Sequence, residues 1–134
     1  MKTILLVDDD KSVRTLYGLA LRRNGYQVIE ADSGSMALDL ARKHLPDLIL
    51  SDIIIPGSDG VSFLREIRRD PDLGNRQFVL MSGSPDVVTS YKGIEEADDF
   101  LVKPISLREL LNCVKARFND SHPYNRSTMA EGRR

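Results

Sequence analysis

Residues 4–10, Ile4-Leu5-Leu6-Val7-Asp8-Asp9-Asp10, join four apolar residues directly to three aspartates. Four further apolar runs follow along the chain, at 28–29, 48–50, 78–81 and 100–102. All five runs are nearly continuous rather than alternating, which is typical of strands covered on both faces by helices. They therefore predict five strands of a parallel sheet.

Segments with helical spacing separate these runs. Apolar residues recur three and four positions apart within 13–20, 37–41, 63–67 and 107–118. Asp10 is expected to cap the first helix, and Ser106 with Glu109 forms a capping box before the last one. The order strand–helix, five times over, predicts an α/β fold: a doubly wound five-stranded parallel sheet with right-handed crossovers.

The fourth helix is the weakest of the five expected. Its segment, 85–93, is rich in Val, Thr, Ser and Gly, which are poorer helix formers than Ala or Leu. Two interpretations stay open, because tertiary packing can make up this deficit or the segment can have low local stability and move.

Composition limits the class of protein. The 134 residues suit a single domain, and the net charge of -1 lacks the basic excess of a nucleic-acid-binding protein. Cys113 is the only cysteine, so we expect a packing residue and no intramolecular disulfide. The first apolar run is too short for a signal peptide or membrane span, which predicts a cytoplasmic protein. Residues 119–134 are polar and aperiodic, as in a C-terminal tail or a linker stub.

Polar side chains follow four of the five predicted strands. The carboxyl ends of parallel strands lie at one edge of the sheet, and ligands bind there at the point where the strand order reverses. Side chains that are far apart in the sequence should therefore converge. They are Asp8, Asp9, Asp52, Ser82 and Lys103.

Such a cluster favours phosphoryl transfer. Several carboxylates cannot all stay ionised beside one lysine without another cation, because like charges raise each other's pKa. Mg²⁺ fits best, since it uses one or two carboxylates and keeps positions for water and phosphate oxygens. A carboxylate can then attack phosphorus, while metal, ammonium and hydroxyl neutralise the equatorial oxygens.

Residues 1–118 resemble the response-regulator receiver domain of two-component signalling, as in chemotaxis regulators. This resemblance implies the flavodoxin-like strand order 2-1-3-4-5 with helices on both faces. It depends on several motifs together: Val7-Asp8-Asp9, Pro46-Asp47-Leu48 leading to Asp52, Pro56 with Asp59-Gly60, Ser82, and Asp99-Phe100-Leu101-Val102-Lys103-Pro104.

The resemblance implies a role for each matching residue around the metal. Asp52 corresponds to the phosphoacceptor and also to a metal ligand. Asp9 corresponds to a direct ligand of Mg²⁺, and Asp8 to a ligand that acts through water. The backbone carbonyl of Ile54 would complete the protein ligands.

Three further roles concern the phosphoryl group and the response to it. Lys103 corresponds to the phosphate-binding lysine, and the Lys103-Pro104 bond is expected to be cis. Ser82 corresponds to the switch hydroxyl, although threonine is commoner there. Phe100 corresponds to the aromatic rotamer switch, with a plain core residue as the alternative.

The resemblance also implies partners. The phosphoryl donor would be a histidine kinase or a histidine phosphotransfer protein. Output would pass through protein contacts to a downstream protein or a missing output domain, and a phosphorylation-dependent homodimer is compatible with this. Neither direct nucleic-acid binding by this chain nor membrane insertion is expected. The chain would catalyse only its own phosphorylation and dephosphorylation.

Two other functions compete with this one. Asp8 and Asp10 form the D-x-D of a phosphohydrolase of the haloacid dehalogenase type, but that chemistry leaves Asp52 unexplained. A docking module that is independent of phosphorylation is the second alternative. It is disfavoured because the acidic pair, Asp52, Ser82 and Lys103 are all present.

Overall fold

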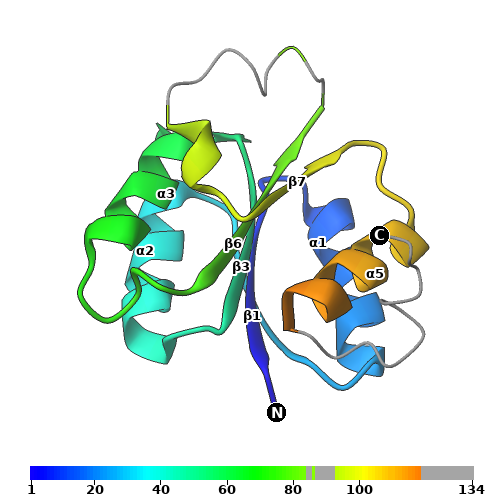
Figure 1. Ribbon diagram of the computed structural model, residues 1–134. Coiled ribbons are helices and arrows are strands. Elements are labelled where there is room, and N and C mark those ends of the chain that lie inside the picture. Colours follow the sequence, from blue (N-terminus) through cyan, green and yellow to red (C-terminus); the bar gives the residue numbers. More distant parts are fainter. Residues whose placement is uncertain (84–85, 87–92, 119–134) are drawn as a thin grey trace.

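The computed structural model describes residues 1–83, 86 and 93–118. Its main sheet has five parallel strands in the order β2-β1-β3-β6-β7, which confirms the predicted fold (Figure 1). The strands are β1 (Thr3–Val7), β2 (Gln27–Ala31), β3 (Leu48–Asp52), β6 (Gln77–Ser82) and β7 (Asp99–Val102). Most of the expected fourth helix, and the segment 119–134, lie outside the described residues.

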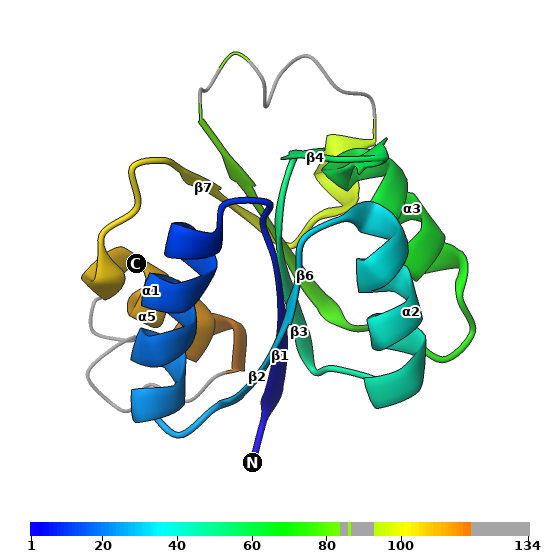
Figure 2. The ribbon, with the colours of Figure 1, turned by 180° about the vertical axis from the view of Figure 1, so that it is seen from behind.

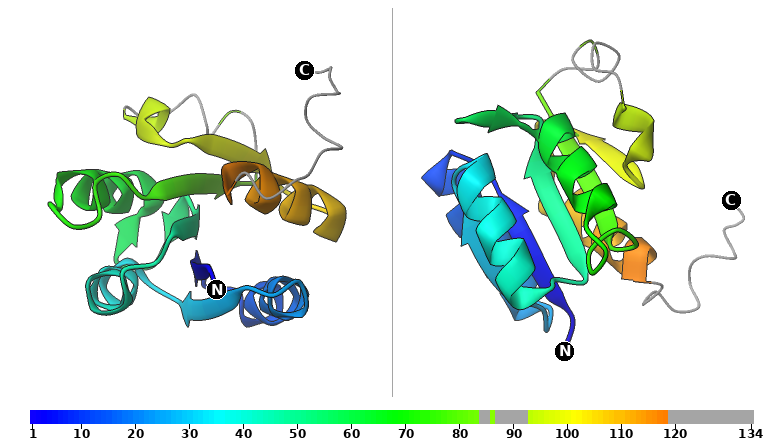
Figure 3. Two further views of the ribbon diagram at one scale, coloured as in Figure 1. Left: turned by 60° about the horizontal axis from the view of Figure 1, so that its bottom comes forward. Right: turned by 90° about the vertical axis from the view of Figure 1, so that its left-hand side faces the viewer.

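Helices cover both faces of the sheet. Helices α1 (Lys11–Arg23) and α5 (Leu107–Phe118) lie side by side on one face (Figures 1 and 2). Helices α2 (Gly34–His44) and α3 (Gly60–Arg69) lie on the other, and a short 3₁₀ helix, η1 (Ile94–Glu96), contacts α3. Figure 3 shows the strands between the two helical layers.

The predicted caps begin two of these helices. The Asp10 carboxylate accepts hydrogen bonds from the backbone N–H groups of Ser12 and Val13, at 2.8 and 3.2 Å. Ser106 and Glu109 each accept a hydrogen bond from the other's backbone N–H, at 3.0 and 3.1 Å. Both predictions are confirmed, because side-chain oxygens satisfy amides that a first turn leaves free.

The core consists of two apolar clusters, one on each side of the sheet. β1 and β3 are almost fully buried, as their continuous apolar runs predict. The edge strands differ from the expectation: β2 and β7 are only partly covered. The apolar runs of the edge strands are shorter than that of β1 but have the same continuous pattern. The pattern therefore does not show which strands have neighbours on both sides, because the strand order decides this.

A two-stranded antiparallel hairpin follows β3 and was not predicted. It consists of β4 (Ile54–Ile55) and β5 (Ser58–Asp59), and Gly57 in its turn has a φ of 78°. Strands of two residues are too short for a periodic signal. The hairpin leads directly into α3, whose first residue, Gly60, packs against the backbone of Asp52.

Candidate functional site

Three aspartates lie together at the carboxyl ends of β1 and β3. One carboxylate oxygen from each of Asp8, Asp9 and Asp52 lies within 4.8 Å of the other two. Asp8 is fully buried, Asp52 is half-buried and Asp9 is exposed. Parallel pairing of β1 with β3 brings these carboxylates together, since Val7 lies beside Ser51 in register. Asp10 is not part of this group, because its carboxylate caps α1.

Lys103 joins two of these carboxylates. Its Nζ donates hydrogen bonds to Asp8 Oδ2 and to Asp52 Oδ2, both at 2.8 Å. The residue follows β7, and its backbone N–H donates to the carbonyl of Ser82 at the end of β6. The Lys103-Pro104 peptide bond is cis, as predicted.

Burial and charge pairing control the protonation of this group. Burial raises the pKa of the Asp52 carboxyl above its ordinary value, and the nearby Lys103 offsets this only in part. Burial by itself lowers the pKa of Lys103, but its hydrogen bonds and charge interactions with Asp52 and Asp8 outweigh this effect and raise that pKa to about 12. Lys103 is therefore a fixed positive charge at physiological pH.

The donor set fits a magnesium ion. Three carboxylates against one ammonium leave two negative charges in excess, and a divalent cation would balance them. Oxygen ligands from one or two carboxylates, with water in other positions, are what Mg²⁺ usually takes in proteins. The backbone N–H of Ile54 also donates a hydrogen bond to Asp52 Oδ1, at 3.3 Å.

Ser82, Phe100 and Ile54 lie around the acidic cluster. Ser82 is buried at the end of β6, one position beyond Met81, which pairs with Asp52 across the sheet. Phe100 is half-buried in β7 and packs against the core cluster that faces α2 and α3. Ile54 is 64% exposed.

One residue at the site was missed by the sequence analysis. Arg14, in the first half of α1, donates a hydrogen bond from Nη1 to the backbone carbonyl of Asp8 at 2.7 Å. No local motif marks this contact, because an arginine on a helix is usually a solvated residue.

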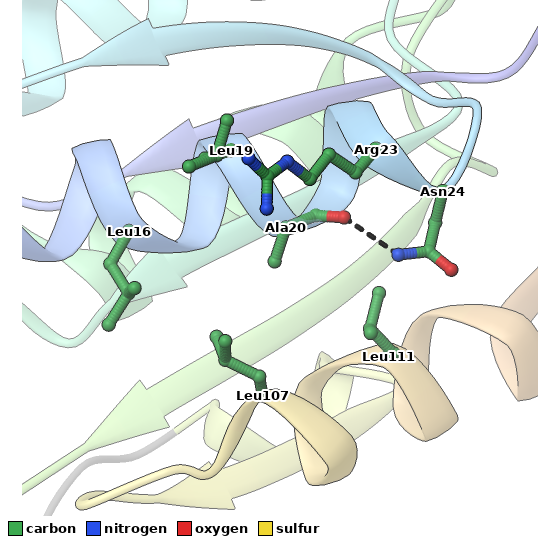
Figure 4. Close-up of a pocket in the computed structure, with 7 residues that line it drawn as sticks. All are labelled: Leu16, Leu19, Ala20, Arg23, Asn24, Leu107 and Leu111. Carbon is green, nitrogen blue, oxygen red and sulfur yellow. Dashed lines mark hydrogen bonds between the residues drawn. The ribbon is translucent and has the colours of Figure 1, made fainter.

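A hollow lies away from the acidic cluster, between α1 and α5. Figure 4 shows leucines from both helices around it, with Asn24 Nδ2 donating to the Ala20 carbonyl at 2.8 Å. Among the residues that the structure describes, none that lines it carries a carboxylate, and Arg23 is the charged one. Exposed apolar surface of this kind suits contact with another protein rather than phosphoryl chemistry. Its apolar residues are Leu16, Leu19, Ala20, Leu107 and Leu111.

The fold and the acidic cluster together define a class of protein: a doubly wound α/β domain with carboxylates and a lysine at the carboxyl edge of its sheet. The response regulator receiver domain family matches residues 4–115, and the chain belongs to this family. It is therefore a receiver domain of two-component signalling, a switch that phosphorylation activates. No helix in the described part of the chain is long and apolar enough to cross a membrane.

Relatives and solved structures agree with this assignment. The transcriptional regulatory protein AfsQ1 of Streptomyces coelicolor is 40% identical over 111 residues, which are 82% of this chain and 48% of AfsQ1. PhoB of Pseudomonas aeruginosa, a phosphate regulon regulator, is 33% identical over 91% of this chain and 54% of its own. The chain spans about half the length of the curated relatives it matches.

Two solved structures match almost along their whole length. A response regulator from Chloroflexus aurantiacus has a TM-score of 0.81 and 34% identity, covering 88% of this chain and 98% of its own. The response regulator TrrA of Thermotoga maritima, in complex with Mg²⁺ and BeF, has a TM-score of 0.79 and 31% identity, covering 87% of this chain and 99% of its own.

Proposed function

We propose that Asp52 accepts a phosphoryl group from a histidine kinase or a histidine phosphotransfer protein, and that Mg²⁺ is required. The observation that carries this proposal is the position of Lys103 Nζ, at 2.8 Å from a carboxylate oxygen of Asp52 and of Asp8. This ammonium lies where an oxygen of a phosphoryl group on Asp52 would need a positive charge.

In the proposed reaction, a carboxylate oxygen of Asp52 forms a bond to phosphorus. The bond from phosphorus to the donor's histidine nitrogen breaks, and its electron pair stays on that nitrogen. The carboxylate must be ionised to attack, so the raised pKa of Asp52 makes the nearby cations necessary. Lys103 stays protonated throughout and stabilises negative charge on the phosphoryl oxygens.

Asp9 is proposed as the direct ligand of Mg²⁺ and buried Asp8 as a ligand through water, with Asp52 and the Ile54 carbonyl completing the set. When bound, the ion would neutralise charge on the phosphoryl oxygens as a Lewis acid. The excess of two negative charges in the cluster supports this assignment. The exposure of Asp9 supports it too, because an ion that keeps its waters needs an open side.

The response to phosphorylation is proposed to involve Ser82 and Phe100. Ser82 is buried beside the strand that carries Asp52, where its hydroxyl could bond a phosphoryl oxygen. Phe100 is half-buried on the neighbouring strand, so inward rotation of its ring would alter the surface near β7. Phosphorylation would thereby shift the population from one conformation of Ser82 and Phe100 to the other.

Membership of the family supports a proposal for the wider function. We propose that residues 1–118 form the receiver domain and 119–134 a tail or linker stub, in a cytoplasmic protein. Output through a downstream protein or an attached domain is part of the same proposal. The chain would catalyse only its own phosphorylation and dephosphorylation. The capping role of Asp10 supports this over a hydrolase, whose D-x-D would need that carboxylate free.

Acetyl phosphate with Mg²⁺ tests the chemistry without the natural donor. Intact-mass measurement should find one labile phosphoryl group on the wild type and none on Asp52→Asn. Asp9→Asn should lose the dependence on Mg²⁺ along with most of the product. Asp10→Asn is the matched control, since it alters an aspartate of the same loop while asparagine preserves the helix cap. A stable adduct on Asp52→Asn, or equal loss in Asp10→Asn, would contradict the proposal.

A further inference from the structure

Arg14 connects three elements at the site. Its Nη1 donates to the carbonyl oxygen of Asp8 at 2.7 Å, and its Nε lies 3.4 Å from Glu30 Oε1 on β2. The side chain is only 15% exposed, so water competes weakly for these contacts. One guanidinium therefore holds the end of β1 to α1 and to the neighbouring strand. Its planar fork makes both contacts from one rigid group.

The peptide groups around the acidic pair are held one after another. The Asp8 N–H donates to the Ala31 carbonyl at 3.1 Å, and the Asp10 N–H donates to Asp8 Oδ1 at 2.9 Å. Between them lies the peptide group that joins Asp8 to Asp9. Its carbonyl is the one that Arg14 holds. The orientation of this group sets the directions in which the two carboxylates project, because both residues flank it.

We propose that Arg14 is a positioning residue for the metal site: by holding the peptide group between Asp8 and Asp9, it directs both carboxylates toward a bound Mg²⁺. This inference rests on the proposed function, in which these aspartates hold the ion. Arg14 itself touches neither the ion nor the phosphoryl group. Glu30 supports it by fixing the guanidinium from the other side.

Charge and positioning predict opposite effects when Arg14 is replaced. The guanidinium is positive, so by charge alone its loss would strengthen the binding of a divalent cation. If Arg14 positions the ligands, its loss weakens binding instead, as happens when groups that orient metal ligands are removed. The sign of the change in affinity therefore separates the two explanations.

Arg22 provides a matched control on the same helix. Its Nη2 lies 3.1 Å from the other carboxylate oxygen of Glu30 and donates to the Val28 carbonyl at 3.1 Å. It shares the acidic partner and the charge of Arg14, but its bonds are to β2 and not to Asp8. Replacing Arg22 thus removes an ion pair with Glu30 and leaves the peptide group of the acidic pair untouched.

Titration calorimetry with MgCl₂ on the full chain, without a phosphoryl donor, tests the inference. Arg14→Met should weaken Mg²⁺ binding by about tenfold. Arg14→Lys keeps the charge but lacks the fork, so it should also weaken binding; it carries the test if Arg14→Met does not fold. Arg22→Met should stay within about twofold of the wild type, because its exposed ion pair is weak.

The outcomes separate this inference from the proposed function. Equal or tighter Mg²⁺ binding by the folded Arg14 variants would overturn the positioning role, and so would an equal loss in Arg22→Met. A wild type that does not bind Mg²⁺ would overturn the proposed function and this inference with it. Amide resonances of Asp9 and Asp10 that shift in Arg14→Lys, but not in Arg22→Met, before metal is added would support the role directly.

Discussion

Replacement of Gly60 by alanine should damage both the stability of the fold and the site. Gly60 is the first residue of α3, and its Cα faces the backbone of Asp52. A Cβ there would overlap the Asp52 carbonyl oxygen and lie 2.9 Å from Ile53 Cα and 3.1 Å from the Asp52 carbonyl carbon. These are backbone atoms that no rotamer change can move away, so the start of α3 or the end of β3 must shift.

Two opposing terms give the expected magnitude. Forcing extra atoms into a packed position costs about 3 kcal/mol at the upper end of the usual range. Alanine recovers at most about 1 kcal/mol through its better helix propensity, since that value holds for a helix interior and Gly60 is the first helical residue. The net loss in the free energy of unfolding is about 2 kcal/mol, which lowers the melting temperature of a domain of this size by about 8 °C. Displacement of the Asp52 backbone should also slow phosphorylation by at least about tenfold.

Thermal unfolding and the rate of labelling by acetyl phosphate measure the two effects. Gly83→Ala is the control: Gly83 is exposed just beyond β6, and a Cβ there would meet no atom of the described residues within 4 Å. It should change stability by no more than about 0.5 kcal/mol. A Gly60→Ala protein as stable and as reactive as Gly83→Ala would refute the steric argument.

Three further predictions follow from the same structure. The exposed, apolar side chain of Ile54 has no group to orient a hydrolytic water, so phosphoryl loss should be slow; Ile54→Asn should speed it more than Ile54→Ala at one Mg²⁺ concentration, and equal rates in all three proteins would exclude this gating. Phosphorylation should change amide exchange most within 82–103, whereas a change confined to the loop after Asp52 would contradict coupling through Ser82 and Phe100. Burial, with Asp99 nearby, raises the pKa of Cys113 to about 12 from 9.0, so below pH 9 an alkylating reagent should label only unfolded protein. Because the folded pKa is raised, the stability that this thiol contributes is complete below pH 9 and is lost as pH rises toward about 12; the stability of Cys113→Ala should lack this loss, and rapid native labelling at pH 8 would contradict it.

The main elements and the place of the site could be predicted from the sequence. Apolar runs and helical spacing report on periodicity, which local chain geometry enforces, and so they located the five strands. The caps at Asp10 and Ser106 were predicted from residue types whose side chains accept hydrogen bonds from a first helical turn. The convergence of Asp8, Asp52 and Lys103 could be predicted for a simpler reason: the carboxyl ends of parallel strands share one edge. The roles of these residues stay predictions until phosphorylation is measured.

Other features depend on contacts between elements that no local pattern encodes. The two-residue strands after β3, the close approach of Gly60 to Asp52 and the bond from Arg14 to the Asp8 carbonyl all need atoms from separate segments within a few ångströms. The same is true of the double hydrogen bond of Lys103. Residue type and spacing predict which side chains reach an edge of the sheet. Tertiary packing alone decides which backbone and side-chain atoms meet there, because such contacts depend on how closely the helices pack against the strands.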